Sequence, residues 1–210
     1  INGNAGAGTQ TAGISFGGGT GPVPSYSTAA NTYNGTSWTS IPALPFSFSL
    51  GGGTGTSTAA IGGGGDGNPP GAVAIWNGSS WTATPTMGKN AYQGQFVGTT
   101  TAAVAAGLYY DSSAQEWNGS SWSDPGQAMP VHVYASSANG TATDGVWIGG
   151  WGPIPTANAQ SVVQHYNGTS WTTQTAMPGS AVPSTMSSGS SPTSDLWVFA
   201  DATAGTFLNS

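Results

Sequence analysis

The stretch YNGTSW at residues 33–38 decides the fold, because the chain repeats it three more times. The other copies read WNGSSW at 76–81, WNGSSW at 117–122 and YNGTSW at 166–171. Their closing tryptophans lie 43, 41 and 49 residues apart. A motif that recurs at nearly constant spacing indicates one supersecondary unit used several times.

The repeated stretch predicts a β-hairpin. Asn-Gly is a preferred hairpin turn, because both residues tolerate positive φ angles. A loop of two residues or of four places Tyr33 and Trp38 on the same face, where they can touch across the strands. Such a contact contributes roughly 0.2–1 kcal/mol. The equivalent pairs are Trp76 with Trp81, Trp117 with Trp122, and Tyr166 with Trp171.

A second signal precedes each hairpin: a threonine-rich turn, then a short apolar strand, then glycines. Its copies run over 9–19, 56–65, 99–107 and 141–150, with a weaker fifth copy at 190–201. Five strand pairs therefore begin, and four of them reach the Asn-Gly hairpin.

Each repeat thus predicts about four short strands, and no stretch shows the sustained 3.6-residue period of a helix. A four-stranded unit of 40–50 residues, repeated, is typical of a propeller blade. We expect one all-β domain over 1–210, a β-propeller of about five four-stranded blades. The approximate repeats are 1–45, 46–87, 88–130, 131–178 and 179–210.

The pattern resembles the kelch repeat, in which a glycine doublet ends one strand and an aromatic residue and a tryptophan follow. The doublets here are Gly17-Gly18, Gly63-Gly64 and Gly149-Gly150. The chain departs from that family in its shorter hairpin and its missing charged residues.

The hairpin variant is also similar to repeats in structural proteins of bacteriophages and other viruses. It shares a turn with the Asp-box of sialidases, but all four turns carry Asn instead of Asp.

The composition of the chain argues against several classes of binding partner and against bound cofactors or metals. Only 4% of residues are charged, the net charge is −6, and Lys89 is the single basic residue. Binding of nucleic acid or of an anionic membrane needs clustered Lys or Arg, so neither is expected. The longest apolar run, 102–110, is about half a membrane span, so we expect no membrane insertion. There is no cysteine, and no motif indicates a cofactor or a metal site.

The candidate ligand-binding residues are aromatic residues that the hairpin does not require. Tyr109, Tyr110 and Asp111 follow one apolar strand, and Trp151 holds the equivalent place one repeat later. Aromatic rings beside a carboxylate are common in sugar sites, because sugar C–H faces pack on rings while hydroxyls bind polar groups. Packing between blades is the alternative role for these rings.

We expect no catalytic residues. The only histidines, His132 and His165, have no spacing that links them to a nucleophile and an acid. A glycosidase would need two carboxylates about 5–10 Å apart. The acids that a propeller could bring together are Asp111, Asp144, Asp195 and Asp201, and no motif supports them.

The sequence leaves three functional hypotheses. The first is a non-enzymatic structural or adhesive module at a virion surface or in an extracellular setting. Its partners would be other structural proteins of a particle or filament, and cell-surface glycans. The second is a lectin-like propeller, and the third a glycoside-active enzyme. The resemblance to viral repeats and the composition, low in charge and rich in Ser, Thr and Asn, favour the first.

Overall fold

The computed structural model describes residues 3–19, 21, 25–109, 111–153, 155–156 and 158–178. Within these residues every regular element is a β-strand. The all-β prediction is therefore confirmed for this part of the chain. The same residues contain no helix long and apolar enough to span a bilayer. The predicted fifth repeat, 179–210, lies outside the described residues.

Four antiparallel sheets of four strands account for most of the described chain, and a two-stranded sheet accompanies them. Sheet 1 contains β1 (Ala5–Thr9), β2 (Ala12–Phe16), β3 (Ala30–Tyr33) and β4 (Trp38–Ile41). Sheet 2 contains β6 (Gly52–Gly55), β7 (Ala60–Gly63), β9 (Val73–Trp76) and β10 (Trp81–Ala83). Sheet 3 contains β11 (Gln95–Gly98), β12 (Ala103–Ala106), β13 (Gln115–Trp117) and β14 (Trp122–Ser123). Sheet 4 contains β15 (Ser137–Thr141), β16 (Asp144–Ile148), β17 (Val163–Tyr166) and β18 (Trp171–Gln174). The small sheet pairs β5 (Ser47–Ser49) with β8 (Asp66–Asn68).

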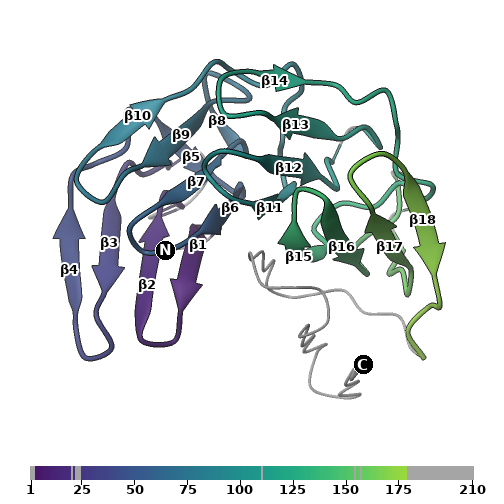
Figure 1. The fold of residues 1–210 in the computed structure, drawn as a ribbon, viewed down its shortest axis with the longest axis horizontal. Helices are drawn as coiled ribbons and strands as arrows, with labels where there is room; N and C mark the ends of the chain where they lie inside the picture. The colour runs from purple at the N-terminus through teal and green to yellow at the C-terminus, as the bar shows by residue number, and fades with distance from the viewer. Residues whose placement is uncertain are drawn as a thin grey trace.

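The four large sheets follow one another around an arc (Figure 1). Their first strands, β1, β6, β11 and β15, lie toward a common centre, and each contacts the next. The strands β4, β10, β14 and β18 lie on the outside. Within each sheet the chain runs up and down from the inner strand to the outer one. This arrangement fits a propeller.

This topology gives the sheets two different ends. The turn end carries the short turns after the first and third strands of each sheet, such as 34–37. The loop end carries the connection after each second strand and the links between sheets, such as 84–94 and 107–114. Antiparallel meanders separate the two kinds of connection in this way, since successive turns alternate ends.

The hairpin loops contain four residues, because Tyr33 pairs directly with Trp38. Their rings lie 5.2 Å apart, and the corresponding rings of sheets 2, 3 and 4 lie 5.4, 5.4 and 5.0 Å apart. Only the glycine has a positive φ angle, +92° at Gly35. Our explanation of the asparagine by positive φ is therefore wrong. Asn34 Oδ1 instead accepts the backbone N–H groups of Thr36 and Ser37, at 3.0 and 2.9 Å.

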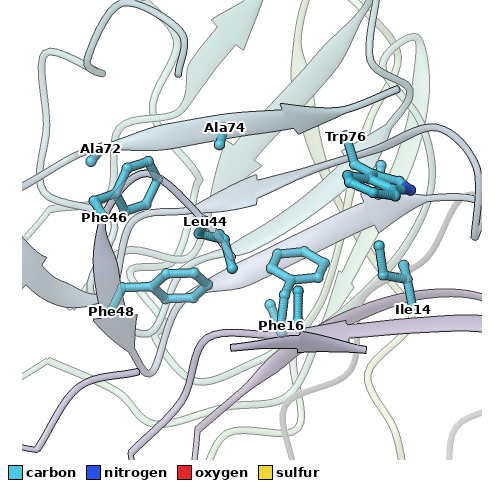
Figure 2. Packing of buried hydrophobic residues seen from close by; sticks show 11 residues of the cluster. Ile14, Phe16, Leu44, Phe46, Phe48, Ala72, Ala74 and Trp76 are labelled. Atoms are coloured by element: carbon cyan, nitrogen blue, oxygen red, sulfur yellow. The ribbon is translucent and has the colours of Figure 1, made fainter. Parts of the chain in front are cut away.

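The core lies between the sheets. At the boundary of sheets 1 and 2, Phe16 reaches toward sheet 2, and Phe48 and Trp76 belong to the same cluster (Figure 2). A Cβ added at Gly53 or Gly62 would lie 2.6 or 2.7 Å from the Phe16 ring. The glycine run in sheet 2 therefore provides the space that this phenylalanine fills.

Candidate functional site

The candidate binding residues lie at the loop end. Tyr109 and Asp111 are on the connection after β12, and Trp151 is on the connection after β16. Tyr110 lies outside the described residues. The turn end, in contrast, repeats nearly the same Thr-rich and Asn-Gly turns in all four sheets. Chemical variety is thus concentrated at the loop end.

Four aromatic residues form what we call the aromatic row: Tyr92, Tyr109, Tyr134 and Trp151. The Tyr109 ring meets Tyr92 edge-on at 5.1 Å and Tyr134 at 4.6 Å. Tyr134 is buried, whereas the other three are half-buried. The row links sheet 3 to sheet 4, so part of its surface is used in packing between sheets and part faces outward.

The backbone fixes the positions of these four rings. The Tyr109 N–H donates to the Tyr92 carbonyl at 3.0 Å, and Tyr134 and Trp151 exchange two such bonds at 3.0 and 2.9 Å. Tyr92 and Tyr134 each lie three residues before an inner strand, and Tyr109 and Trp151 each follow a second strand. The row therefore consists of the same two positions in two consecutive sheets.

An ion pair lies on the same two connections as Tyr92 and Tyr109. Lys89 Nζ is 2.6 Å from Asp111 Oδ2, and the Ser113 N–H donates to Asp111 Oδ1 at 2.8 Å. The hydrogen bond from Lys89 is the main reason that the pKa of Asp111 lies below its usual value. Both side chains remain more than a third exposed. The single lysine of the chain thus holds a carboxylate on the connection that also carries Tyr109.

A phenol–carboxylate pair lies at the loop end of sheets 1 and 2. The Tyr26 hydroxyl donates to Asp66 Oδ2 at 2.6 Å, and this bond raises the pKa of Tyr26. Tyr92 adds a smaller electrostatic contribution to that pKa. Sequence reasoning missed this pair, because the two residues are 40 positions apart and belong to no repeated motif.

The acids and histidines are dispersed. His165 Nε2 lies 2.6 Å from Asp144 Oδ1, beside the turn end of sheet 4, whereas Asp111 lies at the loop end. His132 lies in the link before β15, with Nε2 2.9 Å from the Leu108 carbonyl. Asp195 and Asp201 are outside the described residues. Within the described ranges no three His, Cys, Asp or Glu side chains gather in a way that could hold a metal ion.

The repeated aromatic pairs lie toward the turn end and have partners of their own. Trp76 Nε1–H donates to the Ser57 carbonyl at 3.1 Å, and Trp117 Nε1–H to the Thr100 carbonyl at 2.9 Å. The Tyr166 hydroxyl instead donates to Glu116 of sheet 3. These rings close the turns and join neighbouring sheets.

No protein-family model and no curated protein matches this sequence. Function is therefore inferred from the geometry of the two ends.

Proposed function

We propose that this chain is a non-enzymatic structural or adhesive surface module, built as a kelch-like propeller of about five blades. The observation that carries the proposal is the difference between the two ends. Nearly identical turns cover one end, whereas the other gathers the aromatic row and the Lys89–Asp111 pair. Variable loops on a rigid repeated frame are where binding residues concentrate.

The kelch-like part of the proposal is supported by the order of the strands. Each large sheet meanders outward from an inner strand, and each inner strand contacts the next. The glycine doublets on which the kelch resemblance rests lie at the ends of β2, β7 and β16. Residues 179–210, to which the sequence assigns the fifth repeat, lie outside the described residues.

A non-enzymatic role is supported by Asp111 and Asp144, the two of the four candidate acids that lie within the described residues. Asp111 is paired with Lys89 and Asp144 with His165, at opposite ends of the sheets. Two carboxylates of a glycosidase must share one pocket. This arrangement of Asp111 and Asp144 cannot provide that geometry.

The partners that fit this surface are other structural proteins of a virion or filament. Because only 4% of the residues of the chain are charged, we expect association through backbone groups, hydroxyls and aromatic rings. Such association should be insensitive to salt, because few charges are available to be screened.

The assembly state of the native material tests this proposal. Intact mass spectrometry combined with negative-stain imaging should find many copies of the chain on a particle or filament. A free monomer of about this mass would contradict the structural role and leave the adhesive or lectin role.

The aromatic row favours a second candidate function, binding of a neutral glycan. Tyr92, Tyr109 and Trp151 are half-buried rings at the same end of the sheets as the Asp111 carboxylate. A glycan array would test this role, and Tyr109→Ala should weaken any hit about tenfold, the loss of about 1.4 kcal/mol. Tyr33→Ala, at the turn end, is the matched control and should leave the affinity unchanged. Equal losses in both variants would mean that the effect is on folding.

A further inference from the structure

Asp66 occupies, in sheet 2, one of the two positions that form the aromatic row in sheets 3 and 4. It lies three residues after the second strand of its sheet, as Tyr109 and Trp151 do in theirs. Its backbone pairs with Ser49, which lies three residues before the inner strand β6. Tyr134 and Trp151 are paired in the same way in sheet 4. Sheet 2 therefore carries the same two positions, with a hydroxyl and a carboxylate in place of rings.

The backbone brings Asp66 next to the aromatic row. The N–H of Gly65 donates to the carbonyl of Ala91 at 3.1 Å, between the connections of sheets 2 and 3. Asp66 follows Gly65 and Tyr92 follows Ala91 in the chain. The pKa of Tyr26 is raised mainly by its hydrogen bond to Asp66 and in smaller part by Tyr92, which agrees with this placement. The row thus extends from Asp66 in sheet 2 to the rings of sheet 4.

Asp66 and Asp111, the two carboxylates beside these rings, differ in what already binds them. Oδ2 of Asp111 lies 2.6 Å from Lys89 Nζ, and its Oδ1 accepts the Ser113 N–H at 2.8 Å. Asp66 is half-buried and accepts the neutral Tyr26 hydroxyl through Oδ2, at 2.6 Å. The lysine neutralises the charge of Asp111, whereas the phenol leaves that of Asp66 in place. Because a carboxylate offers about four lone-pair sites, Oδ1 of Asp66 can accept hydrogen bonds from a ligand.

We propose that the loop end binds a linear neutral oligosaccharide along this row, with sugar units on the rings of Tyr109 and Trp151 and hydroxyls donating to Asp66 at one end. Sheets packed face to face lie about 10 Å apart, so the row spans on the order of 20 Å across two sheet boundaries. That length is more than one sugar ring covers. Hydrogen bonds to an ionised acceptor are roughly twice as strong as neutral ones. Asp66, and not the lysine-paired Asp111, is therefore the carboxylate that adds affinity for a long chain.

The inference rests on the glycan-binding candidate of the proposed function, and isothermal titration calorimetry on the full chain tests it. The probes are the disaccharides and hexasaccharides of linear neutral polymers of glucose, mannose, galactose and N-acetylglucosamine. The wild type should bind one hexasaccharide at least about tenfold more tightly than the matching disaccharide, because only the longer probe reaches Asp66 from the rings. Equal affinity for the two lengths would overturn the proposal.

Substitution of each carboxylate identifies the one that binds. Asp66→Ala should weaken binding of the hexasaccharide about tenfold, as loss of hydrogen bonds to a charged acceptor does, and leave the disaccharide affinity unchanged. The matched control, Asp111→Ala, should change either affinity by less than about twofold. Tyr109→Ala should weaken both probes, because both lie on its ring. A loss in Asp111→Ala that is equal to or larger than the loss in Asp66→Ala would contradict the proposal.

The design separates an effect on binding from an effect on folding. The disaccharide affinity of Asp66→Ala reports whether the rings are still in place. The double variant Tyr26→Phe/Asp66→Ala removes both partners of the hydrogen bond, so that no phenol is left without its acceptor. It should show the same selective loss of hexasaccharide binding.

Failure of the inference and failure of the proposed function give different results. If none of the oligosaccharides binds the wild type, the glycan-binding candidate is wrong, and the inference is wrong with it. If they bind but the Asp66→Ala variant retains the full hexasaccharide affinity, glycan binding stands and the role of Asp66 is refuted.

Discussion

The backbone N–H of Gln93 donates a hydrogen bond to the carbonyl of Leu50, 2.8 Å away in the neighbouring sheet. Leu50 donates in turn to Gly3 at 2.7 Å, and Ala135 donates to Gln93 at 3.2 Å. Each of these four residues stands two positions before an inner strand, and each has a φ angle between +51° and +63°. One chain of backbone hydrogen bonds therefore joins the four sheets at their loop end.

The first prediction concerns the left-handed backbone in this chain of bonds. Gln93→Val should lower the free energy of unfolding by about 1–3 kcal/mol, because β-branched residues are strained at positive φ. Gln93→Gly should change it by less than about 0.5 kcal/mol, since relief of strain offsets the greater entropy of the unfolded chain. Urea denaturation of both variants measures the difference. Equal effects would mean that the side chain, and not the backbone, matters at this position.

The second prediction concerns the threonine-rich turn of sheet 2. Gly55 has a φ angle of +115°, and a Cβ there would lie 2.3 Å from the Ala59 carbonyl oxygen. Gly55→Ala should therefore cost about 2 kcal/mol or more of stability. Gly88→Ala is the matched control, since an added Cβ there meets only Gln115 Oε1 at 3.4 Å. Thermal unfolding of the two variants should separate them clearly, and similar Tm values would contradict the turn geometry.

The third prediction concerns the asparagine of the hairpin turns. Asn77 Oδ1 accepts the backbone N–H groups of Ser79 and Ser80, each at 2.9 Å. Asn77→Ala removes this acceptor and should cost about 1 kcal/mol, as loss of a helix N-cap does. Asn77→Asp keeps the acceptor oxygen and should stay near the wild type. If chemical denaturation showed both variants equally destabilised, the amide group itself would be the important part.

The fourth prediction concerns alkaline pH. Burial, with the hydrogen bond to Glu116, raises the pKa of Tyr166 above its ordinary value of 10.0. Above that pH the unfolded chain loses this proton while the folded protein keeps it, so stability falls as pH rises. Tyr166→Phe should reduce the steepness of this fall by up to about 1.4 kcal/mol per pH unit. Tyr33→Phe, in which Tyr166 is still present, should keep the steep fall measured by urea denaturation between pH 9 and 11.

The sequence predicted the sheets because their signals are side-chain patterns. Asn-Gly hairpins, threonine-rich turns and short apolar strands recur at intervals that four antiparallel sheets require. The sequence left the length of the hairpin loop open between two and four residues. The four-residue loop is held by hydrogen bonds from the backbone N–H groups of Thr36 and Ser37 to the Asn34 side chain, and not by the φ angle of Asn34.

The bonds between sheets could not be predicted in the same way. Gly3, Leu50, Gln93 and Ala135 share a backbone conformation and no side-chain type. The aromatic row did leave a signal that spacing can reveal. Tyr92 and Tyr134 lie 42 residues apart, and so do Tyr109 and Trp151. Their contact depends on the packing of sheet 3 against sheet 4, which the sequence alone does not show.

The central claim is that the loop end is the binding face, and the absence of cysteine allows a direct test. A single introduced cysteine at Gln10→Cys attaches the protein to a surface by its turn end, and Pro155→Cys attaches it by its loop end; both positions are exposed. Capture of a neutral glycan identified on the array should persist in the first orientation and be lost in the second. Equal capture in both orientations, or capture only through the Pro155→Cys attachment, would contradict the account.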